Sequence, residues 1–167
     1  MGTCGSLTIL ENLALADNKH NSYGLSPAVN RRREEEYKKM LESCGMGLEN
    51  RMGVLAGSLS GGQRQALALI IATMSDIDLL ILDEHTAALD PKSSETLMKI
   101  TEKVVKEKHL TTLMVTHNLR FAVEYGSRLV MMHGGRAVMD IDGEAKQNLV
   151  VDDILGKFNE ISIECGN

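Results

Sequence analysis

The sequence has few aromatic residues and no excess of positive charge. Aromatic side chains make up 3% of 167 residues, and 18 Lys and Arg stand against 23 Asp and Glu, which gives a formal net charge of −5. Nonspecific binding to nucleic acid depends on basic surface that displaces counterions from phosphates, and many single-strand binders add aromatic side chains for stacking. The composition therefore argues against a nucleic acid as partner.

Long apolar segments are absent as well. No apolar run approaches the roughly 18 to 20 residues of a membrane-spanning helix, and the N-terminus lacks the charged-then-apolar pattern of a signal peptide. The three cysteines, Cys4, Cys44 and Cys165, are an odd number at wide spacing, which is typical of reduced thiols. We therefore predict a protein of the cytoplasm, and its 43% of apolar residues are enough to bury a core.

What the sequence does contain changes in pattern along the chain. Residues 7–75 show mainly helical patterns, whereas from residue 79 onward short apolar runs alternate with helical segments. A Gly-Gly pair at residues 134–135 indicates a hairpin turn. Strands this continuously apolar are usually buried on both faces of a mainly parallel sheet. We predict an α/β fold, with a helical part at residues 1–76 and a sheet-containing part at residues 77–167.

Two charged triplets adjoin within one predicted helix, three arginines at residues 31–33 and three glutamates at residues 34–36. Oppositely charged side chains three or four positions apart lie on neighbouring points of a helix surface and pair there. We interpret the segment as a solvated helix face, in preference to a docking patch for a partner.

The stretch LSGGQ, residues 59–63, opens a predicted helix. Ser60 followed three positions later by Gln63 is a capping-box arrangement, which places Gly61 and Gly62 in the first helical turn. Glycine costs about 1 kcal/mol against alanine inside a helix, so two glycines together need a reason. One reason is a flexible helix entry. The other is an anion site, because unobstructed backbone N–H groups at the positive end of a helix bind phosphate.

Adjacent carboxylates follow the next apolar run. Residues 79–82 lead directly into Asp83 and Glu84, so a buried strand is expected to end with two acidic side chains at its carboxyl edge. Ligands bind at that edge in open α/β sheets. An aspartate there can hold Mg²⁺, and a neighbouring glutamate can orient or deprotonate a water molecule. The alternative is that Asp83 caps a turn.

Two further polar residues stand at element ends. Asp90 before Pro91 is explained by helix capping, with aspartate at the N-cap and proline in the first turn. His117 follows an apolar strand, as Asp83 and Glu84 do, and the same sheet edge would allow it to contact a phosphate. A structural role for this histidine is the alternative.

Together these motifs resemble the ATP-binding subunit of an ABC transporter, over essentially the whole chain. On that resemblance the signature motif is matched by Leu59, Ser60, Gly61, Gly62 and Gln63. The Walker B strand is matched by residues 79–83, with Asp83 at Mg²⁺, and Glu84 matches the catalytic carboxylate. The D-loop is matched by residues 87–90, which end in Asp90, and His117 matches the switch histidine. The resemblance implies a partial P-loop NTPase (RecA-like) parallel-sheet core with an inserted helical subdomain. It also implies ATP and Mg²⁺ as cofactors, a second ABC ATPase subunit in a head-to-tail dimer, and a membrane permease.

The segments GTCGSLTILENLALA and DEHTAALDPK further resemble a bacterial subgroup of this family that serves amino-acid-type importers. The subunit would then lie on the cytoplasmic face of the membrane, bound to the permease through its helical subdomain. His85 departs from the family pattern, which usually has proline after the Walker B glutamate.

The phosphate-binding loop G-x-x-x-x-G-K-[ST] does not occur in the 167 residues. The resemblance places residue 1 just after the family's glutamine loop, and the missing strand would lie between the strand before His117 and the one at residues 128–133. We therefore expect a gap in the sheet with unpaired edges. The isolated chain should bind ATP weakly or not at all, associate with itself, and hydrolyse nothing.

Two other functions remain open from the sequence. The chain could be a partner protein without a P-loop that donates LSGGQ in trans to a complete ATPase subunit. It could also be a soluble ABC ATPase of DNA repair or translation, which the transporter-like LSGGQRQ, the acidic charge and the lack of a coiled-coil insert make the weaker reading.

Overall fold

The computed structural model describes residues 2–18 and 33–164, and within these the chain divides into two compact units. The first unit is Met1–Met114 and the second is Val115–Asn167. The two units meet after Met114, whereas the predicted boundary between the helical part and the sheet-containing part lies between residues 76 and 77. The predicted boundary stays a prediction.

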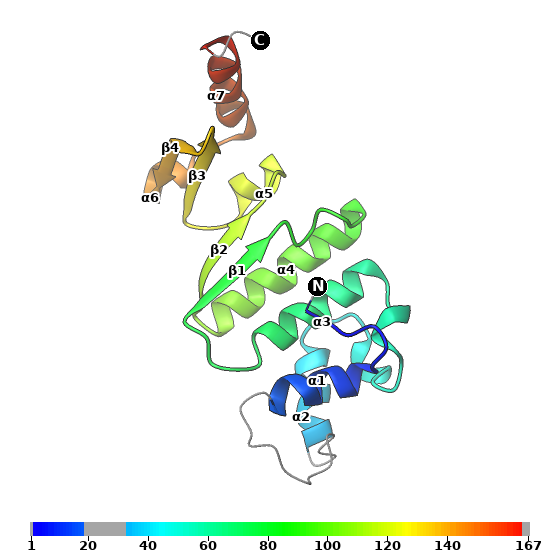
Figure 1. Ribbon diagram of the computed structural model, residues 1–167. Coiled ribbons are helices and arrows are strands. Elements are labelled where there is room, and N and C mark those ends of the chain that lie inside the picture. The colour runs from blue at the N-terminus through cyan, green and yellow to red at the C-terminus, as the bar shows by residue number, and fades with distance from the viewer. Residues whose placement is uncertain (1, 19–32, 165–167) are drawn as a thin grey trace. The chain divides into compact units, whose positions relative to one another are not determined.

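Helices precede and flank two strands in the first unit (Figure 1). Its elements are α1 (Ile9–Asp17), α2 (Glu34–Glu42), the short 3₁₀ helices η3 (Leu48–Asn50) and η4 (Ala56–Ser58), α3 (Gly61–Ala72), β1 (Leu79–Asp83), α4 (Pro91–Glu107) and β2 (Thr111–Val115), whose last residue crosses the boundary. The second unit contains α5 (Leu119–Glu124), β3 (Arg128–His133), β4 (Arg136–Asp142), α6 (Gly143–Gln147) and α7 (Val151–Glu164).

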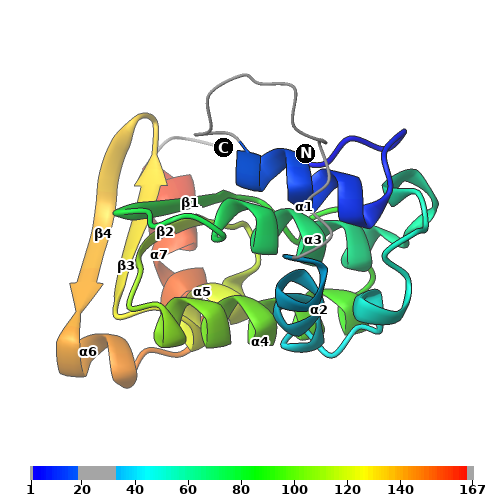
Figure 2. The same ribbon diagram turned by 90° about the horizontal axis from the view of Figure 1, so that it is seen from below.

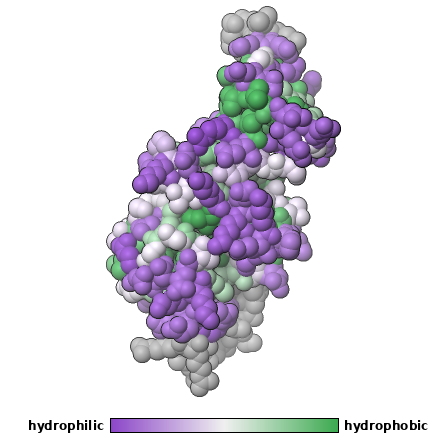
Figure 3. Space-filling model, turned by 180° about the vertical axis from the view of Figure 1, so that it is seen from behind, coloured by the Kyte–Doolittle hydropathy of each residue, from purple (hydrophilic) through white to green (hydrophobic). Residues whose placement is uncertain are grey.

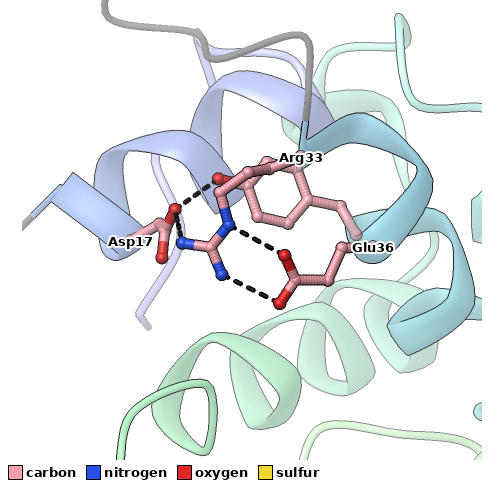
Figure 4. A network of polar contacts seen from close by, with 4 residues as sticks. Asp17, Arg33 and Glu36 are labelled. Carbon is pink, nitrogen blue, oxygen red and sulfur yellow. Dashed lines mark hydrogen bonds and ion pairs between the residues drawn. The ribbon is translucent and has the colours of Figure 1, made fainter.

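A network of charged groups joins the end of α1 to the start of α2 (Figure 4). Arg33 pairs with Asp17 and, through its Nε and Nη2, makes two bonds of 2.9 Å to the carboxylate of Glu36. The buried Tyr37 donates its hydroxyl to Asp17 at 2.7 Å, and burial raises the pKa of this hydroxyl. The predicted pairing of neighbouring triplets is confirmed for Arg33 and Glu36, although α2 begins only at Glu34. Residues 31 and 32 lie outside the described part.

The core of the first unit packs α3 and α4 against the other helices and against β1. Its members are Ile9, Leu13, Ala14, Tyr37, Leu41, Cys44, Leu48, Met52, Ala56, Leu59, Ala66, Leu67, Leu69, Ile70, Leu80, Leu97, Ile100 and Val104. The α4 residues in this set recur at helical spacing, because only one stripe of an amphipathic helix faces a core. Each fully buried Leu, Ile, Val or Met side chain contributes roughly 1.5–3 kcal/mol to the stability of the fold.

The strands β1 and β2 form a two-stranded parallel sheet, and α4 connects them and runs alongside (Figures 1 and 2). The prediction that such strands are buried on both faces is wrong here. Leu80 is 5% exposed, but Leu79, Ile81 and Leu113 are 50–60% exposed. Burial of both faces needs a covering layer on each side. In this unit the Leu80 side of β1 packs into the helical core, while the alternate side chains face outward.

The predicted hairpin is confirmed in the second unit. Strands β3 and β4 pair antiparallel across Gly134 and Gly135, whose φ values of 54° and 75° suit glycine in a tight turn. The β3–β4 pair is a sheet of its own, and the expected gap between β2 and β3 stays a prediction. Its core consists of Leu129, Met131, Leu149, Ile154 and Ile161. Hydrophobic surface is also visible on this unit in the space-filling view (Figure 3). Among the large apolar side chains of this unit, Val130, Met132 and Phe158 are exposed.

The described residues bear on two further predictions, that the cysteines are reduced and that the chain has no membrane-spanning helix. Cys4 is an exposed free thiol and Cys44 a buried one, in agreement with reduced cysteines, while Cys165 lies outside the described residues. Among residues 2–18 and 33–164, the structure has no helix with both the length and the apolar character to cross a membrane.

Candidate functional site

The N-terminus of α3 carries the LSGGQ residues, and it is capped as the sequence predicts. The Ser60 hydroxyl oxygen accepts a hydrogen bond from the Gln63 backbone N–H at 3.3 Å, and the Gln63 side chain accepts one from the Ser60 N–H at 3.3 Å. Because Ser60 Oγ only accepts in this pair, its own proton is still available as a donor. The first helical N–H groups also lack partners within the helix. The capped end therefore has a free hydroxyl proton and backbone N–H groups, which are the donors that an anion requires.

Gly61 and Gly62 have a second reason to be glycines, which is close packing. A Cβ atom at Gly61 would lie 2.9 Å from Cδ2 of Leu89, and one at Gly62 would lie 3.2 Å from Cβ of Ser93. The two glycines thus let the start of α3 approach both the loop before α4 and the first turn of α4. Gly61 is exposed, whereas Gly62 is buried.

Other residues of the signature stretch face inward. The Gln63 side chain donates to the carbonyl of Met46 at 3.3 Å and accepts from Arg51 at 3.4 Å. Leu59 is 4% exposed and belongs to the core. These two side chains hold the helix in place, and the surface that a ligand can reach is formed by Ser60 and Gly61, which are both exposed.

Asp83 and Glu84 stand at the carboxyl end of β1, as predicted, and both are exposed. Glu84 has a φ of 44°, a left-handed conformation that is uncommon for residues other than glycine and is enriched at functional sites. Its carbonyl accepts a hydrogen bond from the Ala87 N–H at 3.0 Å, which closes a turn. The chain reverses here, directly after β1.

The Asp83 carboxylate suits a Mg²⁺ ion of the kind that keeps several water ligands. Mg²⁺ prefers oxygen ligands and is usually bound through one or two carboxylates together with substrate phosphates. In the described part of the chain no group of three or more His, Cys, Asp or Glu side chains converges as a metal site. Asp83 would thus supply one ligand and leave the rest of the coordination shell to water and phosphate oxygens.

The loop after Glu84 is fastened to α4 at several points. His85 Nε2 lies 3.4 Å from Oγ1 of Thr101, and the Ser94 hydroxyl donates to the carbonyl of Thr86 at 3.3 Å. Burial lowers the pKa of the His85 imidazole. Asp90 is the N-cap of α4, as expected, and accepts from the Ser93 N–H at 3.0 Å. Hydrogen bonds from Ser93 lower the pKa of this carboxyl.

His117 lies two residues after β2, is exposed and belongs to the second unit. The neighbouring Asn118 caps α5 by accepting from the Phe121 N–H at 3.2 Å. The predicted meeting of His117 with Asp83 and Glu84 at one sheet edge stays a prediction, since those carboxylates belong to the first unit.

Sequence reasoning missed the residues that join these motifs within the first unit. Leu89 and Ser93 pack against the signature glycines, and Ser94 and Thr101 anchor the loop after Glu84. The glycines and their contacts are more than twenty positions apart in the sequence. No local pattern signals such a contact, whereas the caps are visible from spacings of three.

The family description ABC transporter matches residues 4–87, about half of the chain, which include both the capped start of α3 and the end of β1. The chain belongs to the ABC transporter family. The resemblance inferred from LSGGQ and the Asp83–Glu84 pair is thereby confirmed.

Curated relatives of the chain are ATP-binding proteins of transporters. The chain is 46% identical over 158 residues to the tyrosine transport ATP-binding protein of Clostridioides difficile, a match that covers 95% of this chain and 62% of the relative. It is 33% identical over 135 residues to the phosphonates import ATP-binding protein PhnC of Halobacterium salinarum, covering 81% of this chain and 48% of the relative. The chain thus spans less than two thirds of the length of these relatives.

Solved structures support the predicted fold. An ATP-binding cassette of an ABC transporter, MJ1267, in its ADP conformation matches with a TM-score of 0.72 and 23% identity, over 98% of this chain and 64% of that one. The cassette MJ0796, solved as a dimer bound to ADP and Pi, matches with a TM-score of 0.66 and 26% identity, over 84% of this chain and 58% of that one. The α/β fold of the P-loop NTPase class is confirmed.

Proposed function

We propose that the chain is the C-terminal portion of the ATP-binding subunit of an ABC importer, which couples ATP hydrolysis to transport. The observation that carries this proposal is the exposed start of α3, where Ser60 caps the helix and Gly61 leaves the first-turn backbone uncovered. Such a helix end attracts phosphate through its N–H groups and its positive dipole end. It would act on a nucleotide held by the opposite subunit.

The chain's other residues have separate tasks in this proposal. The Glu84 carboxylate would orient the attacking water and accept its proton, and Asp83 would hold Mg²⁺. Bound Mg²⁺ supplies charge stabilisation to the transferring phosphoryl group. His117 would contact the γ-phosphate, and Asp90, at the end of the loop that packs on α3, would lie at the interface between subunits.

The proposed partners are a second ATP-binding subunit, arranged head to tail, and a membrane permease. The protein would then sit on the cytoplasmic face of the membrane through that permease. The relative for tyrosine transport, at 46% identity, supports an amino-acid-type cargo. The relative named for phosphonates import supports import as the direction. The net charge of −5 agrees with a partner other than nucleic acid.

An alternative is a partner protein that donates LSGGQ in trans to a complete subunit. The observation that favours it is the combination of a well-capped signature helix with a sequence in which G-x-x-x-x-G-K-[ST] does not occur. Both readings expect the chain alone to bind ATP weakly and to hydrolyse none, because P-loop amides and lysine supply most of the triphosphate binding. A titration that found micromolar ATP affinity for the purified chain would contradict both.

Two assays separate these readings. In the first, the chain is co-expressed with the segment of the C. difficile relative that precedes the matched region. An importer subunit should then hydrolyse ATP, and both S60R and E84Q should abolish hydrolysis. In the second, the chain is mixed with a complete family cassette whose own signature serine is replaced by arginine. A trans donor should restore hydrolysis there, and S60R should abolish this effect.

The E84Q variant serves as the matched control in the second assay. The composite site made with the partner's P-loop uses the partner's glutamate, so E84Q should leave the restored hydrolysis unchanged if the chain is a trans donor. If neither assay yields hydrolysis while both mixtures contain folded protein, the proposed function and its alternative both fail.

A further inference from the structure

The side chain of His85 connects the turn that carries Glu84 to the buried face of α4. His85 Nε2 lies 3.4 Å from Oγ1 of Thr101, a residue that is 4% exposed. The Thr101 hydroxyl donates its proton to the carbonyl of Leu97 at 2.9 Å. A hydroxyl has only one proton, so Oγ1 must accept at the other contact, and Nε2 must carry a hydrogen. The arrangement thus requires a hydrogen on Nε2 of His85.

The turn after β1, which His85 connects to α4, contains an unfavourable backbone conformation at Glu84. Glu84 has a φ of 44°, and residues other than glycine remain in this region only where their surroundings hold them there. The Ala87 N–H closes the turn on the Glu84 carbonyl, and the Ser94 hydroxyl fixes the carbonyl of Thr86. His85 is the residue next to Glu84, and its side chain contacts Thr101 on the buried face of α4.

We propose that His85 is a positioning residue for ATP hydrolysis. Its Nε2–H bond to Thr101 holds Glu84 in the left-handed conformation and so sets the direction in which the carboxylate leaves the end of β1. This inference rests on the role proposed above for Glu84. It assigns to His85 no contact with nucleotide, because its donor group points at α4.

The test uses NMR on the ¹⁵N-labelled 167-residue chain and needs no nucleotide. The imidazole nitrogen shifts of His85 report its tautomer, and the intraresidue HN–Hα NOE of Glu84 is strong only while φ is positive. Hydrogen exchange at the amides of Ala87 and Leu89 reports the closure of the turn. The variants are T101V, which removes the hydroxyl at constant shape, H85A, and H85Q, whose side-chain amide offers a donor near the position of Nε2.

A matched control lies one and a half turns earlier on α4. Thr96 makes the same kind of hydroxyl bond, to the carbonyl of Lys92 at 2.9 Å, on the exposed part of the helix. T96V should change none of the three readouts. T101V and H85A should weaken the Glu84 NOE and raise amide exchange in the turn by about threefold to tenfold, as expected for loss of one hydrogen bond. H85Q should restore both relative to H85A.

Two results would overturn the inference: a wild-type His85 protonated on Nδ1 alone, or a Glu84 NOE and turn exchange that T101V and H85A both leave unchanged. Either result would leave the proposed function standing, because the helix end at Ser60 does not depend on His85. Conversely, failure of the ATPase assays together with the expected NMR results would remove the proposed function and leave His85 as an anchor of this turn.

Discussion

Gly61 faces Leu89 so closely that a methyl group on its α carbon would lie 2.9 Å from Cδ2 of Leu89. The atom in the way is the end of a flexible side chain, so G61A should change the free energy of unfolding by less than about 1 kcal/mol. A Cβ at Gly62 would lie 3.2 Å from Cβ of Ser93, an atom whose position is fixed by the backbone of α4. G62A should therefore lower the free energy of unfolding by about 1–2 kcal/mol. Urea denaturation of both variants measures the difference.

The G62A/S93G double variant provides the control for that prediction. If contact with Ser93 causes the loss, the double variant should be less destabilised than the sum of the two single variants, because the obstructing Cβ is gone. Strict additivity would show that the glycine at position 62 is not needed for packing against α4.

Ser60 combines two roles that substitution can separate. S60A removes the acceptor for the Gln63 N–H and should destabilise the first unit by about 1 kcal/mol. S60D keeps an N-cap acceptor and should retain most of that stability, but its negative charge should repel a phosphate. In the co-expression assay both variants should lose hydrolysis, while thermal unfolding should distinguish them. Full hydrolysis in S60D would argue against phosphate contact at this position.

The cap at Asp90 predicts a pH-dependent contribution to stability. Hydrogen bonds from Ser93 lower the pKa of the native carboxyl below its ordinary value of 3.8, so around that pH the unfolded chain binds more protons than the native one. The contribution is complete above 3.8 and is lost as pH falls through the lower native pKa. The Tm difference between wild type and D90N should therefore shrink between neutral pH and pH values below 3.8. An unchanged difference would mean that the cap carries no charge-dependent part.

The outward side of β1 predicts self-association. Ile81 and Leu79, which alternate with Leu80 along β1, are 60% and 50% exposed, and Leu113 of β2 is 55% exposed, whereas Leu80 is 5% exposed. I81K should raise the monomer fraction in sedimentation velocity with little change in stability, because exposed apolar side chains favour association. L80A, the matched variant on the buried side, should instead cost about 2–5 kcal/mol in stability. A wild-type chain that is monomeric at high concentration would contradict the prediction.

Much of the local structure could be predicted because its causes lie within a few residues. Ser60 and Gln63 form the predicted capping box, Asp90 caps α4, and Gly134–Gly135 turns the hairpin. Each depends on a hydrogen bond or a φ value set by neighbours in sequence.

The burial of strand faces could not be predicted in the same way. A strand with the apolar sequence of β1 can have one face or both faces covered by helices. Which of the two occurs depends on the other elements of the fold. Leu79 and Ile81 therefore face outward although their composition is that of a buried strand. The short 3₁₀ helices η3 and η4 and the helix α6 were likewise unexpected, because segments of three to five residues carry little periodic signal.

The sequence by itself determined the family, the capped signature helix and the paired carboxylates after an apolar run, because spacings of one to three residues carry those features. Only the tertiary structure decided that Gly61 and Gly62 pack on Leu89 and Ser93, and that His85 reaches Thr101. Such contacts join residues sixteen or more positions apart. Their distances follow from how α3 and α4 pack over a shared core, and a one-dimensional pattern does not contain that packing.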